Sequence, residues 1–207
     1  LLKNVLSDEL KLMVYDIILT IFKHNIIVLS SLGSETTNPR AQAYQMNKKL
    51  AIQIKELLKS TSFANDITIA IGRSYPVEKL FLSYSEAKQT IFISEILSLG
   101  EIVHFSDCGI FKLACSDPEL LNSFCSQLDP LIQYDELNDG ELIKTLAIYI
   151  KNNQNISKTA KELFVHYQTV RYRLEKISDL LGLNLENFEV LFNLHLALKF
   201  LPFIYQK

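Results

Sequence analysis

A run of polar and aromatic side chains in the last third of the chain has the chemistry that contacts duplex DNA. Gln168 can pair with adenine through two hydrogen bonds and Arg171 with guanine, while Thr169 can bond a phosphate or touch a thymine methyl group. Only Val165 and His166 separate this run from the helical pattern before it, so the two helices must meet at a steep angle. The spacing predicts a helix-turn-helix whose second helix enters the major groove.

The two helices of this motif are predicted from their apolar spacing. The second helix has one apolar stripe, formed by Val170, Leu174, Ile177 and Leu181. Its opposite face is polar and carries Gln168, Arg171, Tyr172, Glu175 and Asp179, with Thr169 and Lys176 at the edge. The first helix is expected to begin after the capping residue Asn155 and to turn four residues inward, namely Ile156, Ala160, Leu163 and Phe164.

Structural roles are open alternatives for several of these residues. His166 can cap the second helix, Thr169 can bond within its own first turn, and Tyr172 can close over the edge of the core. Arg173 lies beside the apolar stripe, so an internal ion pair, with Glu162 as a candidate partner, competes with a phosphate contact.

The net charge of −2 conceals two halves of opposite sign. Residues 1–140 hold 12 Lys and Arg against 17 Asp and Glu, a net −5, whereas residues 141–207 hold nine against six, a net +3. The basic end favours a polyanionic partner. A solvated basic face with no partner is the alternative that charge alone leaves open.

Upstream of the motif, the pattern predicts alternating strands and helices. Strands are expected near 17–22 and 26–28, joined by a tight turn, and again at 67–72 and 102–105. Amphipathic helices are expected at 40–59 and from Pro76 to about Gly100. This is an α/β arrangement in which helices cover a sheet of at least four strands.

The remainder of the chain is expected to be helical. Asp117 can cap a helix that runs to about Gln133, and a polar, acidic hinge is expected at 134–140. Four helical patterns then follow. The predicted organisation is α+β, and its parts are an α/β domain at 1–115, a connecting helix and hinge at 116–140, and an all-α helix-turn-helix domain at 141–207.

Composition excludes several classes of protein. With 207 residues, 48% of them hydrophobic and 21% charged, the chain is typical of a folded protein. Lys23 and His24 interrupt the strongest apolar run, so none reaches the roughly 18–20 residues of a membrane span, and no secretory signal is visible. We expect a cytoplasmic protein with three reduced cysteines, which are Cys108, Cys115 and Cys125.

Motifs for catalysis and metal binding are missing from the sequence. It contains no G-x-S-x-G elbow, no P-loop and no H-E-x-x-H helix. His104 and Cys108 lie one helical turn apart but have no second pair of ligands nearby. We therefore expect neither an enzyme nor a bound cofactor or metal.

The run from Asn155 to Leu185 resembles the C-terminal helix-turn-helix of the PucR/CdaR family of bacterial transcription regulators, and it also looks like the DNA-binding unit of Fis-type proteins. The shared features are Asn155, Thr159-Ala160, His166, Thr169, Arg171-Tyr172-Arg173-Leu174 and Leu180-Leu181-Gly182-Leu183. Spacing and resemblance together give the expected DNA-contacting residues, which are Asn155, Ser157, Thr159, His166, Tyr167, Gln168, Thr169, Arg171, Tyr172, Arg173 and Lys176. Family members commonly carry Arg-Asn in place of Tyr167-Gln168, which implies an altered sequence preference.

The resemblance extends upstream. The run Ile69–Pro76, followed by Ser83–Ala87, is similar to the middle domain of the same family, a degenerate relative of the GGDEF nucleotide-cyclase fold. Cyclase activity is not expected, because the hairpin predicted at 22–26 lacks the Gly-Gly pair of active cyclases. Family members usually carry an effector-sensing domain farther upstream, so a small-molecule effector is expected to act through such a domain.

These observations predict a sequence-specific DNA-binding regulator of catabolic or stress genes. We expect it to bind double-stranded DNA as a homodimer, because one recognition helix touches too few bases to select a genomic site. The hinge at 134–140 is expected to transmit the signal by changing the spacing of the two recognition helices. The alternative is a ligand-sensing or dimerisation module with the helix-turn-helix as a scaffold, which the apolar last helix at 188–201 would suit.

Overall fold

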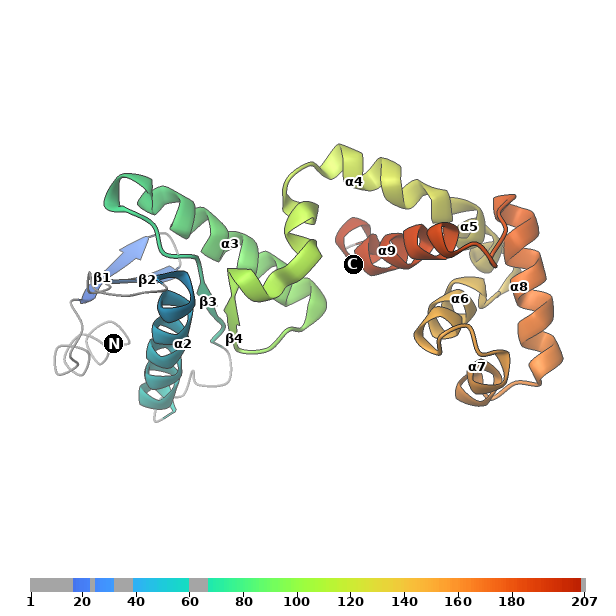
Figure 1. The fold of residues 1–207 in the computed structure, drawn as a ribbon, viewed down its shortest axis with the longest axis horizontal. Helices are drawn as coiled ribbons and strands as arrows, with labels where there is room; N and C mark the ends of the chain where they lie inside the picture. The colour runs from blue at the N-terminus through green and yellow to red at the C-terminus, as the bar shows by residue number, and fades with distance from the viewer. Residues whose placement is uncertain (1–16, 23–24, 32–38, 60–66, 206–207) are drawn as a thin grey trace. The chain divides into compact units, whose positions relative to one another are not determined.

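The chain forms two compact units, residues 1–112 and 113–207, which are described separately below (Figure 1). The computed structural model describes residues 17–22, 25–31, 39–59 and 67–205. Most of these residues are helical, and the strands are short. No helix among them is both long and apolar enough to cross a membrane.

The first unit contains two small sheets. Strands β1 (Ile17–Phe22) and β2 (Asn25–Ser30) pair antiparallel with Phe22 opposite Asn25, which confirms the two expected strands. Their connection at 23–24 lies outside the described residues. Strands β3 (Ile69–Ile71) and β4 (Ile102–His104) pair in parallel with each other.

The expectation of one sheet with at least four strands is wrong for the described residues. The four strands form two separate two-stranded sheets. Alternation of residue types shows that a segment is extended, but it carries no information about which neighbour the segment pairs with. Side chains link the two sheets instead, because Ile17 and Ile69 both pack on a cluster formed by Leu50, Ile54 and Leu58.

That cluster belongs to helix α2 (Pro39–Leu58), which confirms the helix expected at 40–59. Its buried residues recur at helical spacing, as in Ala43, Leu50 and Ile54. Helix α2 contacts β3 and β4, so it covers one face of the parallel pair (Figure 1).

Helix α3 (Leu80–Leu97) connects β3 to β4 and packs on both strands. It starts later than expected, because Pro76 precedes a short 3₁₀ turn, Val77–Lys79, rather than lying in the first turn of the helix. It also ends earlier than Gly100, since Ser98 adopts the left-handed conformation and terminates it. Strand β4 ends at His104, and Phe105 begins a 3₁₀ segment, Phe105–Cys115, instead of extending the strand.

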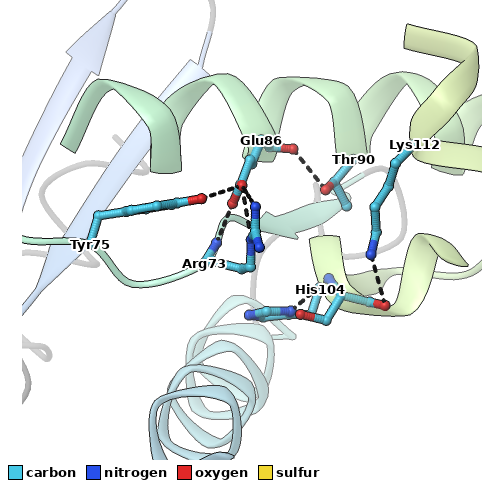
Figure 2. Close-up of polar contacts among 7 residues, drawn as sticks. Arg73, Tyr75, Glu86, Thr90, His104 and Lys112 are labelled. Carbon is cyan, nitrogen blue, oxygen red and sulfur yellow. Dashed lines mark hydrogen bonds and ion pairs between the residues drawn. The ribbon is translucent and has the colours of Figure 1, made fainter. Parts of the chain in front are cut away.

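The loop after β3 is fixed to α3 by a buried carboxylate, Glu86 (Figure 2). Glu86 accepts hydrogen bonds from the Arg73 backbone N–H at 2.9 Å, from Arg73 Nε at 2.9 Å and from the Tyr75 hydroxyl at 2.6 Å. Burial raises the pKa of Glu86, but the hydrogen bonds from Arg73 and Tyr75 outweigh it and hold the pKa below the usual value. The glutamate is therefore ionised and structural.

His104 and Cys108 have structural surroundings as well. His104 Nδ1 accepts a 3.0 Å hydrogen bond from the Ser106 backbone N–H, and burial lowers the pKa of the imidazole. Cys108 is buried beside Thr90, and burial raises the pKa of its thiol. Among the described residues, no group of three or more His, Cys, Asp or Glu side chains could hold a metal ion.

The second unit begins with two helices that precede the helix-turn-helix. Asp117 caps α4 (Pro118–Cys125) by accepting a 2.9 Å hydrogen bond from the Leu120 N–H, which confirms the expected cap. The single helix expected as far as Gln133 is interrupted by a 3₁₀ turn at Ser126–Leu128 and continues as α5 (Asp129–Asn138).

The segment expected as a hinge is mostly helical. Helix α5 runs to Asn138, and Asp139 ends it in the left-handed conformation. The Asp135 carboxylate accepts hydrogen bonds from the backbone N–H groups of Leu142 and Ile143 at 2.8 and 2.9 Å. These bonds satisfy free donors at the start of the next helix, so the acidic character of the segment serves helix capping rather than flexibility.

Four further helices follow, as the sequence predicts. They are α6 (Leu142–Lys151), α7 (Ile156–Leu163), α8 (Tyr167–Leu181) and α9 (Phe188–Ile204). Helices α6, α7 and α8 pack on one another, while α5 and α9 both contact α6 (Figure 1). Their shared core includes Leu146, Val170, Ile177 and Leu194, each with no exposed surface.

Candidate nucleic-acid interface

Helix α7 is anchored at its start by Asn155. The Asn155 side chain accepts a 2.9 Å hydrogen bond from the Lys158 N–H, which confirms the predicted cap. Ala160 and Leu163 are buried in the core shared with α8. This cap and this packing fix the backbone of the first turn of α7, from which the side chains of Ser157 and Lys158 are exposed.

The turn between α7 and α8 contains a feature that the sequence analysis missed. Phe164, expected to face inward, is 94% exposed. Periodicity places residue 164 on the apolar face only if the helix continues, but α7 ends at Leu163 and Phe164 adopts φ +58°. Val165 packs against the core in its place. No feature of the apolar spacing indicates where the helix stops.

The recognition helix α8 begins with a cap supplied by His166. Its Nδ1 atom accepts a 3.4 Å hydrogen bond from the Gln168 N–H, so the capping role left open by the sequence is present. The His166 and Tyr167 rings lie 4.6 Å apart between centroids. At the other end of α8, Gly182 adopts φ +65° and terminates the helix.

One face of the first two turns of α8 is open. Tyr167, Gln168, Arg171 and Tyr172 are all exposed. Tyr172 is 61% exposed, so it does not close over the core edge, and that alternative is wrong. The Arg171 guanidinium lies 3.4 Å from the Glu175 carboxylate, but both side chains are about two-thirds exposed, so the pair is weak and leaves Arg171 available.

Three residues expected at the DNA surface are engaged within the unit. Thr159 has no exposed surface and donates a 2.8 Å hydrogen bond to the Asn155 carbonyl, which corrects its expected DNA contact. Arg173 has a side chain that is 19% exposed and is paired within the unit, so the internal ion pair that the sequence left open is present. Lys176 is partly buried, with its ammonium group 5.4 Å from the centre of the Tyr134 ring.

The internal ion pair of Arg173 has a different partner from the one considered. Arg173 Nη1 donates to Glu141 Oε2 at 3.0 Å and to the Thr145 hydroxyl at 3.2 Å. Glu162 instead accepts from Lys151 and Asn152 at 2.7 and 2.9 Å. Glu141 lies 32 residues before Arg173 in the sequence, at the start of α6. The two residues meet only because α6 packs on α8.

The exposed face has the chemistry expected of a surface that reads base edges. Residues 164–172 contain one cation, Arg171, and no carboxylate. Further cations lie on α7, where Lys158 and Lys161 are exposed and can approach phosphates. The unit therefore presents one exposed cation on the first two turns of α8 and two more on α7.

Comparison with known families agrees with this geometry. Residues 142–200 match the PucR C-terminal helix-turn-helix domain, and these limits enclose α6 to α8 and most of α9. This part of the chain is a PucR helix-turn-helix. The matched limits include α6 and α7, which pack on α8, whereas α5 and Glu141, which also contact α8, lie just before them.

Relatives of PucR/CdaR type match most of the chain. It is 27% identical over 196 residues to the DNA-binding transcriptional activator AdeR of Bacillus subtilis (strain 168), covering 90% of this chain and 44% of AdeR. It is 30% identical over 187 residues to the proline-responsive transcriptional activator PutR of the same organism, covering 87% of this chain and 44% of PutR. A third relative there, the purine catabolism regulatory protein, is 33% identical over 138 residues, covering 64% of this chain and 26% of that protein.

The chain therefore spans less than half the length of these relatives. No solved structure matches it significantly.

Proposed function

We propose that the protein is a sequence-specific DNA-binding transcription regulator that reads the major groove with α8. The observation that carries this proposal is the open face of α8, where Gln168 and Arg171 are exposed on a helix fixed by a PucR-type core. In a helix-turn-helix, the first turns of this helix reach base edges. A regulator of this kind acts in the bacterial cytoplasm, where the DNA lies.

The proposed roles follow from exposure and chemistry. Gln168 and Arg171 contact bases. Tyr167, Thr169 and Tyr172 flank these two side chains on the same helix. Phosphates are held by the polar groups at the start of the two helices, namely Asn155, Ser157 and His166, with Lys176 at the edge. Thr159 and Arg173 act indirectly, since their bonds to Asn155 and Glu141 hold α7 and α8 in place.

The regulated genes are proposed to be catabolic or stress genes. Support comes from the relatives, one of which is described as proline-responsive and another as regulating purine catabolism. The alternative, a module in which the helix-turn-helix is only a scaffold, is not favoured, because AdeR and PutR are both described as transcriptional activators.

Residues 1–115 are proposed to form a degenerate, non-catalytic GGDEF-like domain. The parallel pair β3–β4 with α3 as its crossover is compatible with such a fold. The sequence has no Gly-Gly pair with which to build a nucleotide site of the cyclase kind. A small-molecule effector is proposed to act through a further domain of the complete regulator.

A homodimer on a two-part operator is also proposed. Two recognition helices reading half-sites about one helical turn apart would supply the selectivity that one helix lacks. On α9, Phe188 and Phe192 stack with ring centroids 6.1 Å apart and are exposed, so they offer an apolar surface to a second copy.

The decisive experiment is selection from a pool of random duplex DNA by the purified chain at two salt concentrations. We expect enrichment of a two-part motif, and loss of that enrichment in Arg171→Ala. Lys199→Ala is the matched control, because Lys199 is an exposed cation on α9 rather than on the recognition helix. Salt-sensitive binding without any enriched motif would contradict sequence-specific recognition by this chain.

A further inference from the structure

Phe164 is an aromatic residue that the folded domain does not use. Its side chain is 94% exposed and so makes almost no contact within its unit. Its backbone adopts φ +58°, a left-handed conformation that is disfavoured for every residue with a Cβ atom and is usually filled by glycine. Exposure of a large apolar ring and an unfavourable φ are both costs to the folded unit, which gives no structural reason for a phenylalanine at this position.

The position of Phe164 points to DNA as a molecule that contacts the ring. The turn that contains it lies at the N-terminal end of α8 (Figure 1). Three residues of chain span at most about 11 Å, so the Cα atom of Phe164 lies within that distance of the Cα atom of Tyr167. The backbone of Phe164 therefore lies close to the first turn of α8, the part of the helix proposed to enter the major groove.

The chemistry of the major groove identifies the group that a phenyl ring can contact there. Among the base edges, thymine alone presents a methyl group, and phenylalanine is one of the side chains that contact it. A phenyl ring has no hydrogen-bond donor or charge for a phosphate, so an apolar contact is the one that its chemistry supports.

We infer that Phe164 packs on a thymine methyl group in each half-site and thereby selects thymine at that position. This inference rests on the proposed function. It adds a specificity-determining residue that lies outside the recognition helix, in the turn that precedes it.

The test replaces single thymines of the selected operator with deoxyuridine, which removes the methyl group and keeps base pairing. For the unsubstituted chain, we expect one thymine in each half-site at which deoxyuridine weakens binding about fourfold, the factor that burial of one methyl group is worth. Phe164→Ala should bind the thymine operator about fourfold more weakly and should no longer distinguish deoxyuridine from thymine at that position.

Two sets of variants separate this role from a structural one. Phe164→Gly relieves the positive φ, so its thermal midpoint should equal or exceed that of the unsubstituted chain although its operator affinity falls. Asp139→Gly is the backbone control, because Asp139 also has a positive φ but ends α5. Leu137→Ala is the exposure control, since Leu137 is 84% exposed on α5. Both controls should retain operator affinity and deoxyuridine sensitivity.

The outcomes separate this inference from the proposed function. An operator bound equally well by the unsubstituted chain and by Phe164→Ala would overturn the inference alone. Equal loss of affinity on thymine and deoxyuridine duplexes would overturn the thymine assignment and indicate contact with the sugar instead. If the unsubstituted chain selected no sequence, the proposed function would fail, and the inference with it.

Discussion

Arg173 on the recognition helix is bound to Glu141, which lies 32 residues earlier at the start of α6. The 3.0 Å bond from Nη1 to Oε2 is joined by a 3.2 Å bond to the buried Thr145 hydroxyl, so one guanidinium joins α8 to α6 at two points. Hydrogen bonds from Lys144 and Arg173 hold the pKa of Glu141 below its usual value, and the carboxylate is therefore charged at neutral pH. We expect this contact, together with the buried core, to hold α8 in place.

Replacing Arg173 by alanine should therefore lower both stability and DNA affinity. We expect a loss of about 1–2 kcal/mol in the free energy of unfolding, since the pair is partly exposed and its hydrogen bonds are charge-assisted. The affinity loss should come with little change in the slope of affinity against salt, because no phosphate contact is removed. Urea unfolding and operator binding at several salt concentrations measure the two effects.

Glu141→Gln provides the matched test of this role. It should reproduce most of the stability loss of Arg173→Ala, and the double variant should lose less than the sum of the two single losses. A salt slope that decreases by about one in Arg173→Ala would instead show that Arg173 contacts a phosphate.

Arg171→Ala should have the opposite profile, with weaker DNA binding and unchanged stability. The Arg171 side chain is 70% exposed, so its removal leaves no buried partner unsatisfied. Loss of a base contact should weaken operator binding by about 1–3 kcal/mol. Fluorescence anisotropy with a labelled operator measures the change, and Lys199→Ala should change affinity much less. Equal affinities for both variants and the unsubstituted chain would place the recognition surface elsewhere.

The sequence predicted the helices better than the strand pairing or the details of the site. The apolar stripe of Val170, Leu174 and Ile177 is enough to predict α8, because burial recurs at the helical period. Strand pairing, in contrast, depends on contacts far apart in the chain, and the four strands form two sheets rather than one.

The sequence predicted which residue types lie on α8, but not which of their side chains are exposed and which point inward. Gln168 and Arg171 were expected at the surface and are exposed. Arg173 is two residues further along, and its inward direction depends on Glu141, which no local pattern connects to it. Phe164 was misplaced because a single left-handed residue ended the helix before the apolar face was complete.

Glu86→Gln should destabilise the first unit in a pH-dependent way. The folded pKa of Glu86 is depressed, so its contribution is present above the unfolded value of 4.5 and is lost as the pH falls through the folded pKa. Because the Arg73 side chain is about half exposed, we expect Glu86→Gln to lower the free energy of unfolding by only about 1–2 kcal/mol at pH 7. Urea unfolding of both proteins at pH 7 and pH 3 should show that the difference between their free energies of unfolding is smaller at pH 3. A difference of the same size at both pH values would show that the charge of Glu86 is unimportant.

Gly72→Ala should disrupt the contact between the end of β3 and α3. A Cβ atom at this position would overlap the Ser83 carbonyl oxygen, which is backbone of α3 and cannot move freely. We expect a loss of several kcal/mol, of the order of severe overpacking. Gly109→Ala is the control, because nothing lies within 4 Å of its Cβ position and only its positive φ is affected. The thermal midpoint of Gly72→Ala should be well below that of Gly109→Ala. The reverse order would contradict the close contact between Gly72 and α3.

Combined replacement of Phe188 and Phe192 by serine should weaken self-association of the chain. Each phenylalanine can bury about 150–250 Å², so the pair supplies only about half of the roughly 800 Å² per partner found in stable interfaces. The dimer should therefore be weak in the absence of DNA, with concentration-dependent sedimentation that the double variant abolishes. Leu120→Ser on α4 is the control, because Leu120 is similarly exposed. A chain that remains monomeric in solution and on a two-part operator would exclude the dimer, whereas a dimer unaffected by the double variant would place its interface away from α9.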